Sequence, residues 1–301
     1  MKQNNELRII QQLQERIENQ LYKVGLLFRV FARCKTSDSI NKKIESREPG
    51  YYHEDGKKIQ DLFGVRIALY FPDDLRIAQR ALESIFELDS RQVDSHDSAL
   101  FSATRCNFVF RLPQELVEES HILKTNMLVE STFEVQFRTV LSEGWHEVEH
   151  DLRYKCSEDW HRHDDLNRAL NGIYASLETS EWAMTRLFED LAYRHYKSSE
   201  WAPMIRNKFR LRAGNELDAD LEQVITNTEG LGKKIYRLNR ARLLITILKY
   251  DIKLPISIDN LVYICNYFFI RSAELNDATP AVVRLTLDEL VRRKKEQEQQ
   301  T

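Results

Sequence analysis

The sequence predicts an α+β domain followed by an all-α extension. Stretches that alternate apolar and polar residues, as strands do, occur only in the first half of the chain, where they mix with helical patterns. After residue 205 apolar residues recur at helical spacing, without a convincing strand. Only nine Gly and six Pro accompany 42% hydrophobic and 30% charged residues, a composition typical of helix-rich globular proteins. We therefore expect two parts, residues 1–200 and 201–301.

The first expected elements are two helices. The apolar stripe that predicts a helix over residues 6–31 consists of Ile10, Leu13, Ile17, Leu21, Val24 and Phe28. A second helix is expected to begin at Thr36 or Ser37, whose hydroxyl groups can cap it, and to end near Ser46. A Pro-Gly pair at residues 49–50 then predicts a loop.

Three strands are expected next. Residues 64–71 alternate apolar and polar side chains, which places Arg66 on the polar face. A helix over residues 74–88 separates this strand from a second strand over 106–112, and the third spans 133–139. Beyond the third strand the pattern is helical, with short breaks at Pro and Gly residues.

The third expected strand, FEVQFRT, carries a polar row on one face. Its aromatic and aliphatic side chains alternate with Glu134, Gln136 and Arg138. At about 3.3 Å per residue, Glu134 and Arg138 lie about 13 Å apart, so one row could touch both partners of a group transfer. We expect this row to face a pocket.

A cluster of basic residues precedes the first expected strand. Residues 23–47 contain seven basic and two acidic residues. Arginine and lysine both bind phosphate oxygens well, so the cluster predicts a polyphosphate site, with a solvated helix face as the alternative. Asp61 follows, and its carboxylate suits either an ion pair or Mg²⁺, which uses one or two carboxylates together with substrate phosphates.

Four motifs in this order resemble those of RelA/SpoT-type alarmone synthetases. They are RCKTSDSINKK at residues 33–43, IQDLFGVRI at 59–67, EVQFRT at 134–139 and WHEVEHDLRYK at 145–155. The resemblance implies a mixed-sheet, nucleotidyltransferase-like synthetase domain and a small single-function or toxin-like member. It also implies an ATP-dependent transfer of pyrophosphate to the 3′ hydroxyl of GDP or GTP.

Carried over by position, the resemblance implies a site for ATP and Mg²⁺. The residues that would bind ATP are Arg33, Lys35, Lys43 and Arg66. Asp61 and Glu134 would be catalytic and would hold Mg²⁺, and Glu134 would position or deprotonate the acceptor hydroxyl.

The acceptor side departs from the family pattern. Members that use guanine nucleotides carry a G-Y-x-S-x-H element, whose Tyr stacks on guanine, whereas this chain has HDSALFSATRCNFVF from residue 96. Phe101 is the candidate ring and Arg105 the candidate cation, beside Gln136 and Arg138. GDP or GTP is the first expected acceptor, and an adenine nucleotide or the 3′ end of tRNA is the alternative.

The second part offers two candidate surfaces for partners. Residues 231–250 carry six cations and no acid, interleaved with Tyr236 and Tyr250, a pattern that suits tRNA or other RNA but also a basic solvated face. The apolar run LVYICNYFFI at residues 261–270 suits an internal core, or a docking face for a protein partner or a second copy.

Two other interpretations of the site remain. HEVEH at residues 146–150 has the spacing of zinc proteases but lies inside a matched motif. A catalytically inactive nucleotide sensor or scaffold is the non-enzymatic alternative, although Asp61 and Glu134 are both present.

The remaining features indicate a cytoplasmic protein. The formal net charge of −3 gives no overall attraction to nucleic acid or membranes. The four cysteines are dispersed without CxxC spacing, so we expect free thiols. No stretch approaches the ~20 apolar residues of a membrane span, and the first residues lack the apolar core of a signal peptide.

Overall fold

The chain forms two compact units in a computed structural model that describes residues 2–93 and 106–300. The first unit comprises Met1–Asn19 and Phe28–Glu181, and the second comprises Gln20–Leu27 and Trp182–Thr301. Two long helices, α1 (Lys2–Lys23) and α8 (Asp164–Lys197), contribute residues to both units.

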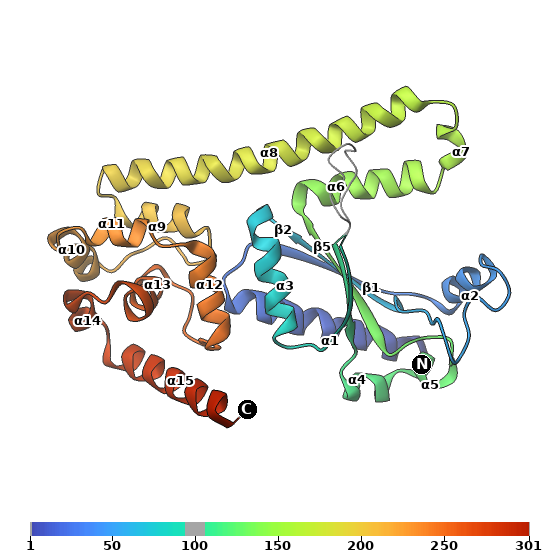
Figure 1. The fold of residues 1–301 in the computed structure, drawn as a ribbon, viewed down its shortest axis with the longest axis horizontal. Coiled ribbons are helices and arrows are strands. Elements are labelled where there is room, and N and C mark those ends of the chain that lie inside the picture. Colours follow the sequence, from blue (N-terminus) through green and yellow to red (C-terminus); the bar gives the residue numbers. More distant parts are fainter. Residues whose placement is uncertain (1, 94–105, 301) are drawn as a thin grey trace. The chain divides into compact units, whose positions relative to one another are not determined.

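The first unit is built on a five-stranded mixed sheet with the order β1-β2-β5-β4-β3 (Figure 1). The strands are β1 (Phe28–Cys34), β2 (Phe63–Leu69), β3 (Leu88–Val93), β4 (Cys106–Arg111) and β5 (Thr132–Thr139). β2 and β5 run parallel, and the other neighbouring pairs run antiparallel. The mixed sheet confirms the α+β architecture expected for the first half of the chain.

Helices surround this sheet. Besides the parts of α1 and α8, they are α2 (Ser37–Glu45), α3 (Leu75–Glu83), α4 (Gln114–Glu119), α5 (His121–Thr125), α6 (Val140–Glu149) and α7 (Ser157–Trp160). A π-helical turn over His150–Tyr154 follows α6. The core takes the apolar side chains of the central strands, such as Val65 and Phe133, together with those of α1 and α3, such as Leu13 and Ala78.

The first helix ends earlier than its apolar stripe predicts. The expectation of a helix over residues 6–31 is wrong beyond Lys23, because Gly25 adopts φ of +74°, a left-handed conformation that glycine reaches without steric cost. The chain then continues as β1, where Phe28 pairs with Leu69 of β2. The apolar side chain of Phe28 fits a helical stripe and a strand equally well, so spacing alone misassigned it.

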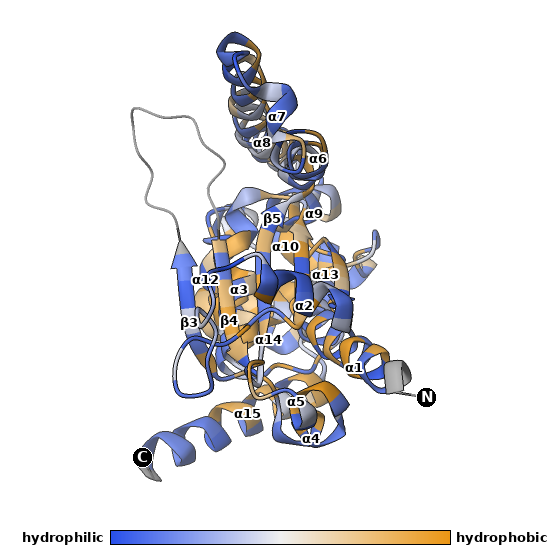
Figure 2. Ribbon diagram, turned by 90° about the vertical axis from the view of Figure 1, so that its right-hand side faces the viewer, coloured by the Kyte–Doolittle hydropathy of each residue, from blue (hydrophilic) through white to orange (hydrophobic). Residues whose placement is uncertain are grey.

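Another predicted helix ends early, and an unpredicted strand begins where that helix was expected to end. The helix expected over residues 74–88 ends at Glu83, and β3 begins at Leu88. The sequence of β3, LDSRQV, is mostly hydrophilic, as Figure 2 shows beside the apolar β4. β3 is an edge strand that pairs only with β4, so no alternating apolar pattern marks it.

The second unit is helical throughout its described residues, as expected. Its helices after α8 are α9 (Trp201–Phe209), α10 (Ala219–Asn227), α11 (Leu231–Tyr236), α12 (Arg240–Lys249), α13 (Ile258–Cys265), α14 (Ala273–Ala278) and α15 (Ala281–Gln300), with a π-helical turn over Asn266–Ile270 after α13. Ser257 caps α13, because its side chain accepts a hydrogen bond of 3.1 Å from the Asn260 backbone N–H. In the part of the chain that the structure describes, no helix combines the length and apolarity needed to cross a membrane.

Candidate active site

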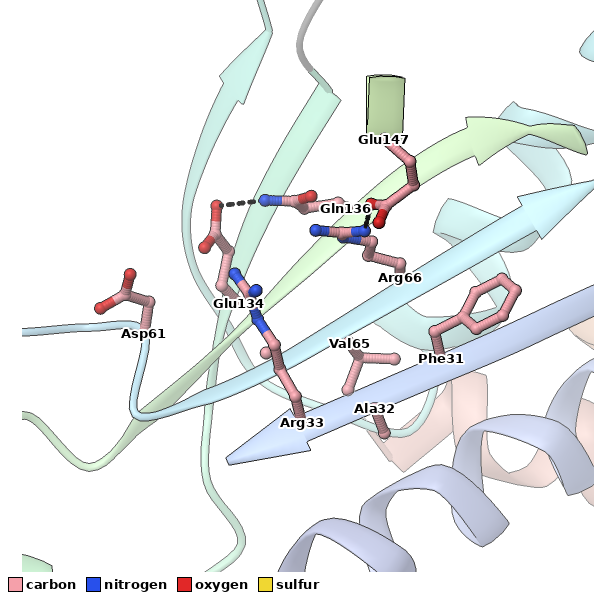
Figure 3. Close-up of a pocket in the computed structure, with 10 residues that line it drawn as sticks. Phe31, Ala32, Arg33, Asp61, Val65, Arg66, Glu134, Gln136 and Glu147 are labelled. Atoms are coloured by element: carbon pink, nitrogen blue, oxygen red, sulfur yellow. Dashed lines mark hydrogen bonds and ion pairs between the residues drawn. The ribbon is translucent and has the colours of Figure 1, made fainter. Parts of the chain in front are cut away.

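A pocket of about 240 Å³ lies over the polar face of β1, β2 and β5. In the strand register Arg33 pairs with Gly64, and Gly64 pairs with Glu134. Directly paired residues face the same side of a sheet, so these three positions form one row across three strands. Figure 3 shows the side chains of Arg33 and Glu134 rising from this row. The position between them in the register is Gly64, which has no side chain.

A second row runs parallel to the first, one pleat further along the strands. It consists of Phe31 on β1, Arg66 on β2, Gln136 on β5 and Asn107 on β4. Arg138, two residues beyond Gln136 on β5, extends the polar face. The polar row predicted in FEVQFRT therefore faces a pocket, and the structure brings it together with Arg33, Asp61 and Arg66.

Two amide groups hold the Glu134 carboxylate. Asn107 Nδ2 donates a hydrogen bond of 2.7 Å to Glu134 Oε1, and Gln136 Nε2 donates to the same oxygen at 3.4 Å. Among the described residues, Oε2 has no hydrogen-bond partner. An ionised carboxylate only accepts hydrogen bonds, so Oε2 is available to accept one from a hydroxyl group in the pocket.

Asp61 also lines the pocket and is paired with two lysines. Lys43 Nζ lies 2.8 Å from Oδ1 and 2.9 Å from Oδ2 of Asp61, and Lys35 Nζ also donates to Oδ2. Burial alone would raise the pKa of Asp61, but the hydrogen bonds from the two lysines outweigh it and the pKa is lowered. The carboxylate is therefore ionised at neutral pH.

The positions of these lysines follow from the start of α2. Thr36 caps this helix, because its Oγ1 accepts a hydrogen bond of 3.2 Å from the Ser39 backbone N–H, as the sequence predicts. Lys35 directly precedes the cap, and its backbone N–H is hydrogen-bonded to Leu62 O at 2.9 Å, next to Asp61. Lys43 lies in the last turn of the helix.

Helix α6 supplies two glutamates that the sequence analysis did not single out. Glu143 bridges two arginines, with Oε1 lying 3.0 Å from Arg66 Nη1 and Oε2 lying 2.8 Å from Arg138 Nη1. Glu147 binds Arg66 Nη1 as well. Burial would lower the pKa of Arg66, but the charges and hydrogen bonds of both glutamates raise it. The sequence signal that could have identified the two glutamates is their four-residue spacing, which places them on one face of a helix that begins directly after the polar strand.

A second cavity of about 430 Å³ shares Arg33, Arg66 and Gln136 with the first. Its other lining residues include Asn107, Arg138, Trp145, His146, Arg153 and Tyr154. Arg153 lies over the Trp145 ring, with 5.6 Å between its Cζ atom and the ring centroid. Aromatic faces beside guanidinium groups suit a flat, charged molecule such as a nucleotide.

Three sequence-based predictions gain no structural support: the acceptor roles of Phe101 and Arg105 and the zinc site. Phe101 and Arg105 fall outside the described residues. In the part that the structure describes, no group of three or more His, Cys, Asp or Glu side chains could hold a metal ion, so the zinc interpretation of residues 146–150 gains no support.

Three of the six cations of the basic stretch 231–250 make contacts within the second unit. Arg240 is buried and donates to Phe209 O at 2.5 Å. Arg242 lies over the Phe269 ring, and Lys249 forms an ion pair of 3.2 Å with Glu298. The apolar run at 261–270 contributes Leu261, Val262 and Ile264 to the buried core.

The segment that forms the pocket resembles known proteins. Residues 32–159 match a family model described as "Region found in RelA / SpoT proteins". A crystal structure of small alarmone synthetase 1 from Bacillus subtilis is similar, with 20% identity and a TM-score of 0.48 over 61% of this chain and 92% of that one. A GTP pyrophosphokinase family protein from Streptococcus pneumoniae is similar at 18% identity, with a TM-score of 0.48 over 62% of this chain and 91% of that one. Curated protein sequences give no match.

Proposed function

We propose, from the match of residues 32–159 to the RelA/SpoT family model, that the protein transfers the β,γ-pyrophosphate of ATP to the 3′ hydroxyl of a nucleotide. The observation that carries the proposal is the in-register row of Arg33, Gly64 and Glu134. This row places a phosphate-binding cation and a hydrogen-bond-accepting carboxylate on one rigid surface, with an open position between them. Pyrophosphate transfer requires both groups at once.

The donor side of the pocket has the cations that a triphosphate needs. Arg33 and Arg66 line the pocket directly. Lys35 and Lys43 are held at its edge by Asp61, from which their flexible side chains can turn toward phosphate oxygens. Among the described residues, Arg33 has no carboxylate partner, so its guanidinium is ready to receive a phosphate.

Mg²⁺ fits the same pocket. Asp61 and Glu134 both line it, Asp61 is ionised, and two carboxylates together with substrate phosphates are a typical Mg²⁺ ligand set. When bound there, Mg²⁺ would neutralise charge on the phosphate oxygens of the donor.

The chemical step follows from the position of Glu134. The acceptor 3′ oxygen attacks the β-phosphorus of ATP, a new oxygen–phosphorus bond forms, and the bond from that phosphorus to the α-phosphate oxygen breaks, which releases AMP. The hydroxyl proton passes to Glu134, whose Oε2 accepts it while Asn107 and Gln136 hold Oε1. Arg33 and Arg66 stabilise the charge on the transferred group.

The second cavity supports a nucleotide as the acceptor. It adjoins the pocket and offers the exposed Tyr154 ring together with Arg138 and Arg153. Aromatic rings can stack on a base, and guanidinium groups can bind the acceptor phosphates. We assign GDP or GTP as the first acceptor on the basis of the RelA/SpoT motifs in the sequence.

The test is a transfer assay with separate acceptors. Purified protein is mixed with Mg²⁺ and ATP labelled on the γ-phosphate, and GDP, GTP, an adenine nucleotide or tRNA is offered in turn. We expect AMP to form and the label to appear on GDP or GTP. Label on an adenine nucleotide or on tRNA would retain the reaction and correct the acceptor. ATP binding without AMP from any acceptor would favour a nucleotide sensor.

A further inference from the structure

Two glutamates of α6 neutralise the two arginines Arg66 and Arg138. Glu143 has a single negative charge and shares it between Arg66 and Arg138, so this trio alone carries one net positive charge. Glu147 supplies a second negative charge to the same atom, Arg66 Nη1. The positive charge that an incoming phosphate would use is therefore already neutralised by a side chain of α6.

The two glutamates differ in how firmly they are held. The Glu143 side chain is 10% exposed and binds both arginines through its two oxygens. The Glu147 side chain is 50% exposed and binds Arg66 alone. Glu147 also lines the pocket wall, where Figure 3 shows its carboxylate beside the Arg66 guanidinium. Glu147 can consequently leave Arg66 for water, whereas Glu143 cannot.

The position of Glu147 on α6 favours its release from Arg66 once a phosphate binds that arginine. Glu143 and Glu147 are four residues apart on α6, so their like charges lie on the same face and repel each other. The arginine between them compensates for this repulsion. A phosphate group presents several oxygens and more charge than one carboxylate, so it binds the guanidinium more strongly and removes that compensation.

We propose that the Glu147 carboxylate occupies a phosphate subsite on Arg66 and competes with the phosphates of the donor, so that it sets the affinity of the pocket for polyphosphate. This inference rests on the proposed function only in taking a polyphosphate as the ligand of the pocket. Glu147 makes the pocket selective for highly charged ligands, because an anion of lower charge does not displace Glu147 from Arg66.

Calorimetric titration with inorganic tripolyphosphate tests the inference without requiring catalysis. Glu147→Gln removes the competing charge and keeps the side-chain size. We expect its dissociation constant for tripolyphosphate to fall by about three- to tenfold, the range for a half-exposed ion pair. Glu158→Gln is the matched control, because Glu158 is exposed on α7 and makes no ion pair among the described residues. It should bind within about twofold of the wild type.

A second pair of variants assigns the effect to Arg66. In an Arg66→Ala background, Glu147→Gln should no longer tighten binding, because the two residues then have nothing to compete for. Unchanged or weaker binding by Glu147→Gln alone would overturn the inference, as would a lack of tripolyphosphate binding by both proteins. If Glu147→Gln binds more tightly while no acceptor yields AMP, the transfer proposal fails and the competition stands.

Discussion

Asn107 and Glu134 lie on neighbouring strands and are joined by a hydrogen bond of 2.7 Å from Nδ2 to Oε1. The pairing β4-β5 sets this contact, since Asn107 lies opposite Gln136, two residues beyond Glu134. Gln136 donates to the same oxygen from within β5. Both amides thus restrain the rotation of the carboxylate while leaving Oε2 for a hydroxyl group.

Replacement of Asn107 tests this restraint. In Asn107→Ala the Glu134 carboxylate keeps its charge but loses its stronger hydrogen bond and can rotate. We expect kcat for pyrophosphate transfer to fall by about 10- to 100-fold, because a misoriented base loses much of its advantage. The KM for ATP should stay unchanged. Steady-state kinetics at several ATP concentrations separate the two constants, and an unaltered kcat would show that the carboxylate needs no such restraint.

Glu134→Gln tests the carboxylate itself. The amide cannot accept the hydroxyl proton, so we expect transfer to slow by on the order of 10²- to 10⁴-fold. ATP binding measured without Mg²⁺ should remain, since the four cations on the donor side are untouched. Single-turnover AMP formation gives the rate and equilibrium titration gives the affinity. Wild-type turnover in this variant would exclude proton transfer to Glu134.

Gly64→Val tests the open position in the row. A Cβ atom at residue 64 would lie 3.7 Å from the Cγ and Nε atoms of Arg33, an ordinary contact, and valine favours strands. The fold should therefore be as stable as the wild type or slightly more so. The valine side chain would fill the floor of the pocket between Arg33 and Glu134. The KM for ATP should therefore rise about tenfold or more.

Gly144→Ala is the control for this variant. Gly144 lies on α6 with nothing within 4 Å of an added Cβ atom. Alanine should raise the free energy of unfolding by up to about 1 kcal/mol through helix propensity and leave the kinetics unchanged. Equal loss of ATP binding in both variants would contradict a specific role for the space at Gly64.

The ion pairs of Asp61 predict a pH-dependent contribution to stability. In the folded protein the pKa of Asp61 is lowered from its ordinary value of 3.8. Burial would raise this pKa, but the hydrogen bonds and charges of Lys35 and Lys43 have the larger effect. A depressed carboxyl pKa contributes stability that is complete above the unfolded value and is lost as the pH falls through the folded one. Asp61→Asn should therefore lower the free energy of unfolding by about 1–2 kcal/mol at pH 7.

This difference should shrink as the pH falls below about 4, where the carboxylate of the unfolded chain becomes protonated, and it should be lost as the pH falls through the lowered pKa of the folded protein. Urea unfolding at a series of pH values between 7 and 3 measures it. Asp55→Asn serves as the control, because Asp55 is exposed and has no ion pair among the described residues. A difference between wild type and Asp61→Asn that is as large at pH 3 as at pH 7 would contradict the assignment.

The sequence predicted the central strands and the pocket face well, because their side chains alternate with period two. Arg66 and Glu134 could be placed on the polar face from that alternation alone, and Asp61 from the motif before the strand. The contacts of Asn107, Glu143 and Glu147 could not be predicted, since they depend on the pairing of β4 with β5 and on the direction of α6. Strand β3 gave no apolar pattern, because its edge position does not require one.

The row across β1, β2 and β5 fixes the distance between the backbones of Arg33 and Glu134 through strand pairing, without a loop. Neighbouring strands lie about 4.8 Å apart, and backbone hydrogen bonds hold Arg33 and Glu134 two strands from each other. Six of the fourteen residues that line the second cavity come from α6 and the turn after it. If the proposed transfer is correct, substitutions of those six residues should alter the acceptor and leave the transferred group unchanged. Such a division would let related proteins diversify their products while keeping one reaction.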